Sequence, residues 1–307
     1  MRTRIDLVTA YVRTAGRYSW RIVRPVLIAY LVILLMLSFF ERMLVYPAPR
    51  HSETEWVVEG LPHEDVYFTA DDGTKLHGWY VPHPQPKAVV LFCHGNGENV
   101  ARLAPLLRLL HDRAQVSTFA WDYRGYGRSA GKPHEENVLA DARTAHMWLA
   151  ERAGVRPEDV VVYGRSLGGA VAVGLAAEFP VRGLVLERTF AELVETAQHH
   201  FRWLPVRLLM KNRFPSAERI TTYRGPLFQS HGTEDEVVPF AMGKKLFDAA
   251  TTENKKFFVV EGGDHNGPQP DDYYVALGEF LDSLPAAGGG VNGSTAHVNG
   301  VEKLEPR

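Results

Sequence analysis

The stretch that decides the fold is VVYGRSLGGAVA, residues 161–172. An apolar run is interrupted by the pattern G-x-S-x-G and then continues as an Ala-rich pattern typical of a helix. This order is typical of a nucleophile elbow, a sharp strand-to-helix turn that presents a serine. Gly164 and Gly168 leave the room that such a turn needs. In a chain with 27 glycines the pattern alone is weak, but its setting between strand and helix predicts Ser166 as a catalytic nucleophile.

Short apolar runs alternate with helical patterns around this stretch, which favours a mostly parallel sheet with helices on both faces. The runs 66–69 and 76–81 are separated by Asp71-Asp72-Gly73, a hairpin signal that predicts an antiparallel start. Further strands are expected at 88–93, 117–122, 160–164, 183–187, 226–230 and 256–260, and helices at about 99–112, 135–152, 168–179, 240–250 and 271–283. The prediction is an α/β fold of about eight strands.

The chain of 307 residues has room for one large α/β domain, which we expect at 46–284. Residues 190–224 are too long for a simple strand connection and predict a short helical cap over the site. A peripheral helix packed on the domain is the alternative. Residues 285–307 have too few apolar side chains to pack, so we expect a disordered tail.

The N-terminal part reads as a basic segment, 1–24, followed by a membrane anchor, 25–45. The basic segment has six arginines against one acid, and Pro25 to Phe40 carries no charge. With its apolar flanks this run approaches the roughly 20 residues that cross a bilayer. A cleaved signal peptide or a helix lying on the surface is the alternative, although Ser38-Phe39-Phe40 is too bulky for a cleavage site. The arginines predict a cytoplasmic N-terminus and a catalytic domain on the outer side of a single-pass membrane protein.

The net charge of −2 divides into +5 for residues 1–24 and −7 for the remainder. An acidic domain argues against a nucleic-acid partner. The one cysteine, Cys93, ends an apolar run and is interpreted as a buried structural thiol. The composition gives no prediction of oligomeric state.

A serine nucleophile needs a base and an orienting acid on later strand ends. His265 follows the last expected strand in the loop Gly262-Gly263-Asp264-His265, where an imidazole can reach the sheet edge. The acid should lie between Ser166 and His265. The distance that each side chain can reach does not distinguish Glu234, Asp235 and Glu236 as the acid. Glu187 is a further candidate that only the geometry of the fold can exclude.

Two N–H donors must also face the tetrahedral intermediate of such a reaction. One belongs to Leu167, directly after the nucleophile. The second is expected from the loop HGNGEN, residues 94–99, where we choose Asn96, although a simple glycine-rich turn explains the same letters. In the loop after the 117–122 strand, Asp122 is interpreted as a hydrogen-bonding scaffold.

No cofactor or metal is predicted. His199 and His200 are adjacent and would diverge on a helix, so they do not form a chelating pair. The Gly-x-Gly at 95–97 lacks the rest of a dinucleotide fingerprint, and no Walker pattern occurs.

Five segments, in this order, resemble the α/β-hydrolase superfamily, and most closely its membrane-anchored branch with lysophospholipid and monoacylglycerol lipases and protein depalmitoylases. The segments are HGNG at 94–97, DYRGYG at 122–127, GRSLGG at 164–169, HGTEDEVVP at 231–239 and GDHN at 263–266. The resemblance implies that the acid is Asp235 and that the backbones of Asn96 and Leu167 form the oxyanion hole. Glu187-Arg188-Thr189-Phe190 departs from the pattern, since a Ser or Pro more often precedes the Phe.

The sequence therefore predicts a serine hydrolase of carboxylic esters, including thioesters or lipid acyl esters, that works through an acyl-enzyme. Its expected partners are a small-molecule or lipid acyl ester and, through the N-terminal helix, the membrane. The basic residues Arg202, Arg207, Lys211 and Arg213 are read either as solvated surface charge or as contacts to an anionic head group. A serine peptidase of the prolyl-oligopeptidase-like type is one alternative function, and a non-catalytic membrane interaction protein is another.

Overall fold

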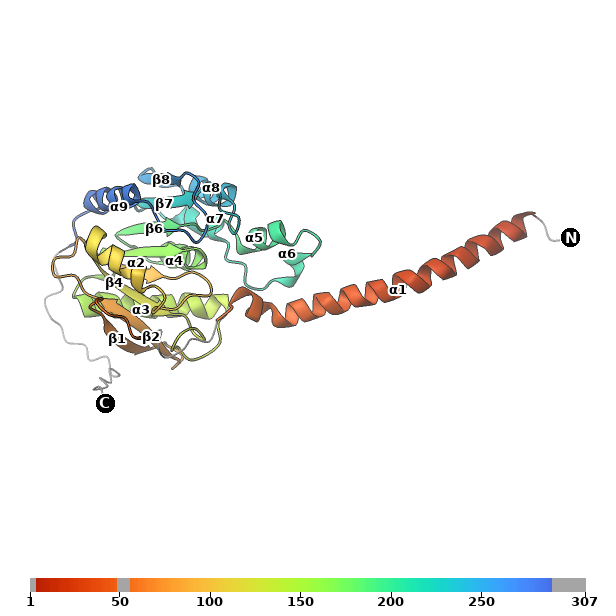
Figure 1. Ribbon diagram of the computed structural model, residues 1–307, viewed down its shortest axis with the longest axis horizontal. Helices are drawn as coiled ribbons and strands as arrows, with labels where there is room; N and C mark the ends of the chain where they lie inside the picture. The colour runs from red at the N-terminus through yellow and green to blue at the C-terminus, as the bar shows by residue number, and fades with distance from the viewer. Residues whose placement is uncertain (1–3, 49–55, 289–307) are drawn as a thin grey trace.

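Strand β5 (Val160–Arg165) lies in the middle of an eight-stranded sheet in the computed structural model (Figure 1), with its first five residues fully buried. The structure describes the backbone of residues 4–48 and 56–288, and the side chains from residue 20 onward within these ranges except residue 22. A strand buried on both faces reads as an uninterrupted apolar run, which explains the letters VVVY at 160–163.

The strand order is β1-β2-β4-β3-β5-β6-β7-β8. The pairs β1–β2 and β2–β4 are antiparallel, and the other pairs are parallel. This confirms the predicted fold class and the antiparallel start. The remaining strands are β1 (Glu64–Thr69), β2 (Lys75–Val81), β3 (Ala88–Cys93), β4 (Val116–Asp122), β6 (Gly183–Glu187), β7 (Leu227–Gly232) and β8 (Lys255–Val260).

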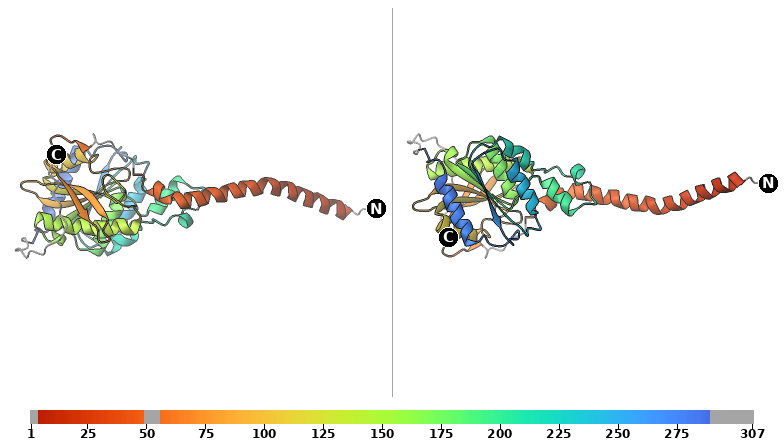
Figure 2. Two further views of the ribbon diagram at one scale, coloured as in Figure 1. Left: turned by 90° about the horizontal axis from the view of Figure 1, so that it is seen from below. Right: turned by 90° about the horizontal axis from the view of Figure 1, so that it is seen from above.

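Helices cover both faces of the sheet, with a separate apolar core under each layer (Figures 1 and 2). One layer contains α3 (Glu135–Ala153), α4 (Leu167–Glu178) and α8 (Phe240–Ala249). The other contains α2 (Ala104–Leu109) and α9 (Asp271–Ser283). All of these were expected from the sequence to within a few residues, except at the start of α2.

The helix expected at 99–112 starts only at Ala104. Residues 99–103 form a turn in which side chains satisfy the backbone: the N–H of Val100 donates to Asp122 (2.9 Å) and that of Arg102 donates to Asn99 (2.9 Å). After α2 the chain widens into a π-helical turn, Leu110–Ala114. Side chains thus compete with the helix for these N–H groups.

The insert at 190–224 contains three short helices and one 3₁₀ turn: α5 (Leu193–His200), α6 (Val206–Leu209), α7 (Ser216–Arg219) and Ile220–Thr222. Helix α7 packs against α4 and α8, on the body of the domain. Helix α5 contacts α8 through Thr196 and Glu195, and α6 lies beside α1 (Figure 1). The insert is therefore helical, as expected, and only part of it lies on the domain.

Helix α1 (Arg4–Val45) is continuous for 42 residues, so within the described part the basic segment and the apolar run are one helix. Its section Val23–Val45 is long and apolar enough to cross a membrane. Tyr46 follows directly and is buried, with its N–H donating to the carbonyl of Arg42 (2.8 Å). The helix therefore joins the domain through packed residues. The expected disordered tail lies outside the described residues from 289 onward.

Candidate active site

Ser166 lies between the end of β5 and the start of α4, with φ 52° and ψ −119°. A non-glycine residue rarely adopts a positive φ, and such strain is typical of functional sites. The neighbouring glycines make the turn possible: a Cβ on Gly164 would lie 2.3 Å from the carbonyl oxygen of Gly168, and one on Gly168 would lie 2.0 Å from that of Cys93. The structure thus has the strand, turn and helix that the opening stretch predicts.

A hydrogen-bonded chain joins the three side chains selected from the sequence. Nδ1 of His265 donates to Oδ2 of Asp235 at 2.8 Å, and Ser166 Oγ donates to Nε2 at 3.0 Å. Ser166 is partly exposed, while Asp235 and His265 are buried. This geometry leaves the imidazole able to take the hydroxyl proton while the carboxylate fixes its tautomer.

Burial distinguishes Asp235 from its two acidic neighbours as the orienting acid, whereas side-chain length alone did not. Glu234 and Glu236 are exposed, whereas Asp235 points inward and its Oδ1 accepts the N–H groups of Val237 (3.0 Å) and Val238 (2.7 Å). Burial alone would raise the pKa of Asp235, but hydrogen bonds from His231 and His265 hold this pKa well below its usual range. The carboxylate is therefore ionised at neutral pH.

Glycines allow the loop that carries Asp235 and the loop that carries His265 to lie close together. A Cβ on Gly232, the last residue of β7, would lie 2.1 Å from the carbonyl oxygen of Gly263. That same carbonyl accepts the N–H of Glu234 at 3.0 Å. The two loops therefore approach at backbone distance, which only a residue without a side chain allows.

Glu187, the rival acid, has other partners. Its carboxylate accepts the hydroxyl of Tyr163 and lies 3.6 Å from Nε of Arg165. Nδ1 of His265 points to Asp235 instead. The geometry thus excludes Glu187 as the acid that orients His265. Its carboxylate instead belongs to a buried group of side chains with Tyr163 and Arg165 at the end of the strands.

The two expected oxyanion donors flank Ser166. Leu167 is the first residue of α4, and the first N–H groups of a helix have no partner within it. On the other side, the position of a Cβ on Gly95 lies 3.6 Å from Cβ of Ser166, so the 94–97 turn is adjacent to the nucleophile. Asn96 follows in this turn.

The side chain of Asn96 is engaged away from the nucleophile. Its Nδ2 donates to the carbonyl of Val45 at 2.6 Å, and its Oδ1 accepts the hydroxyl of Tyr126 at 2.5 Å. Only the backbone N–H of Asn96 is therefore left as the candidate donor. The amide side chain connects the last residue of α1 to the loop beside Ser166.

Arg188 is a buried residue beside the site that sequence reasoning did not select. Its side chain is fully buried, and its Nη1 donates to the carbonyls of His265 (2.9 Å) and Gly267 (2.6 Å). Nε and Nη2 have no partner within the described residues. Arg188 itself has a φ of 48°, and its N–H donates to the carbonyl of Ser230 (3.0 Å). The only signal in the sequence was the departure of Glu187-Arg188-Thr189-Phe190 from the family pattern.

Asp122 acts as a scaffold rather than an acid of the site. It is fully buried and accepts hydrogen bonds from Nδ1 of His77 (2.6 Å) and from the backbone of Val100 and Arg128. These contacts fix the loop after β4 to the turn that follows the 94–97 loop. Among residues 4–48 and 56–288, no group of three or more His, Cys, Asp or Glu side chains is placed to hold a metal ion.

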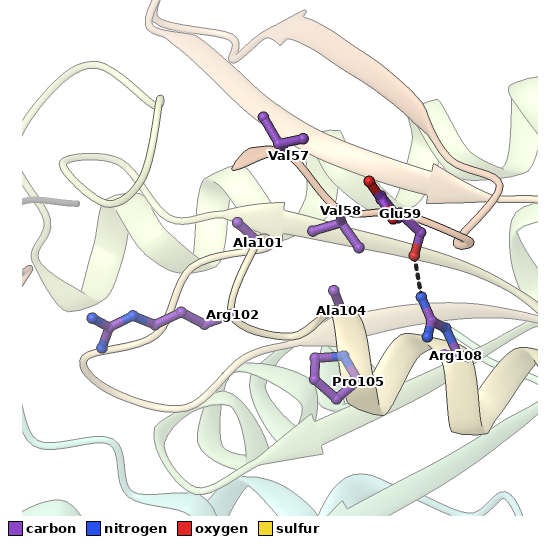
Figure 3. Close-up of a pocket in the computed structure, with 8 residues that line it drawn as sticks. All are labelled: Val57, Val58, Glu59, Ala101, Arg102, Ala104, Pro105 and Arg108. Carbon is purple, nitrogen blue, oxygen red and sulfur yellow. Dashed lines mark hydrogen bonds between the residues drawn. The ribbon is translucent and has the colours of Figure 1, made fainter. Parts of the chain in front are cut away.

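A hollow of about 550 Å³ opens between the segment after residue 55 and the start of α2 (Figure 3). Arg108 closes one side of it by donating to the carbonyl of Glu59. Ser166, Asp235 and His265 do not line it. We therefore assign it no part in the site. Its lining residues are Val57, Val58, Glu59, Ala101, Arg102, Ala104, Pro105 and Arg108.

The chain is similar to several known proteins. The family described as "Serine aminopeptidase, S33" matches residues 84–223. The uncharacterized protein Rv2307c of Mycobacterium tuberculosis is 38% identical over 255 residues, which cover 82% of this chain and 89% of that protein. Human alpha/beta hydrolase domain-containing protein 17B is 33% identical over 201 residues, 66% of each chain.

Solved structures show the same fold. The esterase Pf2001 of Pyrococcus furiosus superposes with a TM-score of 0.63 at 22% identity, over 77% of this chain and 97% of the esterase. An alpha-beta hydrolase from Vibrio vulnificus gives a TM-score of 0.63 at 21% identity, over 80% of this chain and 91% of that protein. From the family match and the relatives together, the chain belongs to the α/β-hydrolase superfamily.

Proposed function

We propose that this hydrolase cleaves carboxylic esters or thioesters through an acyl-enzyme. Ser166 Oγ attacks the acyl carbon while Nε2 of His265 takes its proton. The same proton then goes to the leaving alcohol or thiol, which departs as the tetrahedral intermediate collapses. Water repeats the sequence with His265 as base, so the acid is released and Ser166 is regenerated.

The observation that carries this proposal is the chain from Asp235 through His265 to Ser166, with contacts of 2.8 and 3.0 Å. Asp235 stabilises the imidazolium that forms during attack. The N–H groups of Leu167 and Asn96 stabilise the oxyanion, and losing one such donor typically costs about 100- to 1,000-fold in rate.

The attachment of α1 supports an acyl substrate drawn from a membrane. Val45, the last residue of the apolar helix, is hydrogen-bonded to Asn96 in the loop beside Ser166. A chain anchored through α1 therefore has its nucleophile close to the lipid surface. We propose a cytoplasmic N-terminus and a catalytic domain on the outer side, because the arginines precede the apolar section.

A peptidase is the second candidate, since the matched family is described as a serine aminopeptidase. The same triad cleaves amides on this fold when the site protonates an amine leaving group. Both candidates use Ser166, so they differ in the leaving group rather than in the nucleophile.

The test uses full-length protein in detergent with p-nitrophenyl esters from acetate to palmitate and with aminoacyl p-nitroanilides. We expect ester hydrolysis that is abolished in Ser166→Ala, whose folding is checked by circular dichroism. Hydrolysis of the anilides alone would replace the esterase proposal by the peptidase. Equal inactivity of the folded wild type and Ser166→Ala on all substrates would contradict both.

A further inference from the structure

Residues 201–213 of the insert, here the cap tip, lie along the C-terminal half of α1 (Figure 1). At one end the hydroxyl of Tyr30 donates to the carbonyl of Trp203 at 3.0 Å, and the two rings are 6.4 Å apart. At the other end Oε1 of Glu41 accepts the N–H groups of Lys211 (2.7 Å) and Asn212 (2.9 Å). At 1.5 Å per residue, Tyr30 and Glu41 are about 16 Å apart along the helix.

One face of α1 is covered where the cap tip runs. The less exposed residues recur at intervals of three or four, the spacing of a single helical stripe. The rest of the apolar section is open, with Leu35 72% and Phe39 80% exposed. The cap tip is thus attached to the apolar helix along a defined face. The residues of that face are Tyr30, Leu34, Leu37, Ser38, Glu41 and Val45.

The cap tip presents large apolar side chains outward. Trp203 is 61% and Leu208 86% exposed, and Phe201 is 49% exposed. A soluble surface seldom gathers such residues without a partner. The cap tip also has four basic residues and no acidic one, and the carboxylate of Glu192 pairs with two of them, Arg207 and Arg213. The basic residues are Arg202, Arg207, Lys211 and Arg213.

We propose that the cap tip inserts into the same lipid leaflet as the C-terminal half of α1. In this arrangement Trp203 and Leu208 enter the acyl region and the basic residues meet anionic head groups. The proposal rests on the anchoring of α1, and the hydrolase activity does not enter it. If Val23–Val45 crosses a bilayer, Tyr30 lies within the hydrocarbon layer, and a segment bonded to Tyr30 shares its depth.

Lipid fits this surface better than a second copy of the chain does. The ring of Trp203 lies beside that of Tyr30 on α1, whose other sides are open, so one bilayer covers both. Segments that lie in a lipid surface commonly combine Trp, Phe and Leu with Lys and Arg, as the cap tip does.

The cap tip also reaches the catalytic loops. Nε2 of His200, next to Phe201, donates to the carbonyl of Val237 at 2.9 Å, and Val237 is itself 47% exposed. Val237 donates its N–H to Asp235. Insertion of the cap tip therefore brings the rim of the site to the lipid surface, where an acyl chain can leave the leaflet for Ser166.

The test labels single cysteines with an environment-sensitive fluorophore in the full chain, reconstituted in vesicles of phosphatidylcholine and phosphatidylglycerol with doxyl-labelled lipids as quenchers. The native Cys93 is fully buried and burial raises its pKa to about 12, so it does not take the label. The probe variant is Leu208→Cys. Its matched control is Val275→Cys, a 64% exposed apolar site on α9, on the far side of the body from α1.

We expect a blue-shifted emission and doxyl quenching for Leu208→Cys, and a water-like, unquenched emission for Val275→Cys. A third site, Leu35→Cys on α1, reports the anchor itself. Quenching at Leu35 without quenching at Leu208 would overturn insertion of the cap tip. No quenching at either site overturns it as well, because the helix would then lie outside the bilayer. If the emission of the label at Leu208→Cys in detergent shifts to the blue as the protein concentration rises, the cap tip binds a second copy of the chain instead of lipid. Ester hydrolysis by the same samples separates these outcomes from failure of the proposed function.

Discussion

The side-chain amide of Asn96 donates a 2.6 Å hydrogen bond to the carbonyl of Val45, and so joins the loop beside the nucleophile to the end of α1. The same side chain accepts the hydroxyl of Tyr126. Asn96 is thus fixed from two directions, while its backbone N–H is the proposed oxyanion donor. Rigid placement of such donors is what makes them effective.

Replacing Asn96 by Ala keeps the backbone N–H but removes both attachments of the side chain. We expect kcat for p-nitrophenyl butyrate to fall by about 10- to 100-fold with KM little changed, since a shift of 1 Å in a catalytic group has effects of this order. Tyr126→Phe removes only one attachment and should have a smaller effect. An unchanged kcat in Asn96→Ala would mean that the loop keeps its position without α1.

Asp235→Asn should lower kcat by about 10,000-fold, because the amide no longer fixes the tautomer of His265. Matched substitutions of the neighbours, Glu234→Gln and Glu236→Gln, alter exposed residues and should leave kcat within a factor of about two. Steady-state kinetics at pH 7 check this. A comparable loss in Glu236→Gln would show that the acid was assigned wrongly.

Stability at low pH should also depend on Asp235. Its pKa is lowered in the folded state, so its contribution is complete above the unfolded value of about 4 and disappears as the pH falls toward the folded value. Wild-type protein should therefore lose free energy of unfolding below about pH 4 more steeply than Asp235→Asn does. Urea denaturation at a series of pH values measures both slopes. Parallel slopes would contradict the assignment.

Arg188 should position His265 through the loop carbonyls that it binds. We expect Arg188→Met to lower kcat by about 10- to 100-fold with KM nearly unchanged, and Arg188→Lys to recover part of the loss. The substitution removes a buried charge but also leaves the carbonyls of His265 and Gly267 without this donor, so activity and stability have to be measured together. Thermal unfolding of Arg188→Met therefore separates positioning from a role in stability. A loss of stability in proportion to activity would favour the latter.

Glu41 should determine whether the cap tip stays on α1. Ala at this position leaves the N–H groups of Lys211 and Asn212 without this acceptor, at a cost of about 1–3 kcal/mol for the buried group of Asn212. Hydrogen exchange at 211 and 212 should become faster in Glu41→Ala. Glu41→Gln retains an acceptor oxygen and should keep most of the protection. Unchanged exchange in Glu41→Ala would show that other contacts hold the cap tip.

The sheet, its strand limits and the turn at Ser166 followed from local patterns, because buried strands and an elbow each have a distinctive spacing. The choice of Asp235 over Glu234 and Glu236 depended on the family resemblance, since burial of one of three adjacent carboxylates is set by how the loops pack. Gly232 and Gly263 produce that packing, but neither glycine alone predicts it.

Contacts between distant segments could not be predicted. Tyr30 and Trp203 are 173 residues apart, and no periodicity in either segment indicates the other. The role of Arg188 was hidden for the same reason: its partners are the carbonyls of His265 and Gly267, and a carbonyl carries no sequence signal. The turn at 99–103 was read as helix because its apolar spacing does not show that Asp122 takes one of its N–H groups.

Helix α1 passes into buried Tyr46 and onto Asn96 with packed residues at the junction. With α1 anchored in a bilayer, as proposed, the domain has little freedom to tumble above the lipid surface, so its active site stays at one height and one orientation. If the substrate is a lipid acyl ester, as proposed, enzyme and substrate then meet by lateral diffusion in two dimensions. The rate of such an enzyme follows the mole fraction of substrate in the leaflet, and adding inert lipid slows it by surface dilution even when the total substrate in the sample is constant.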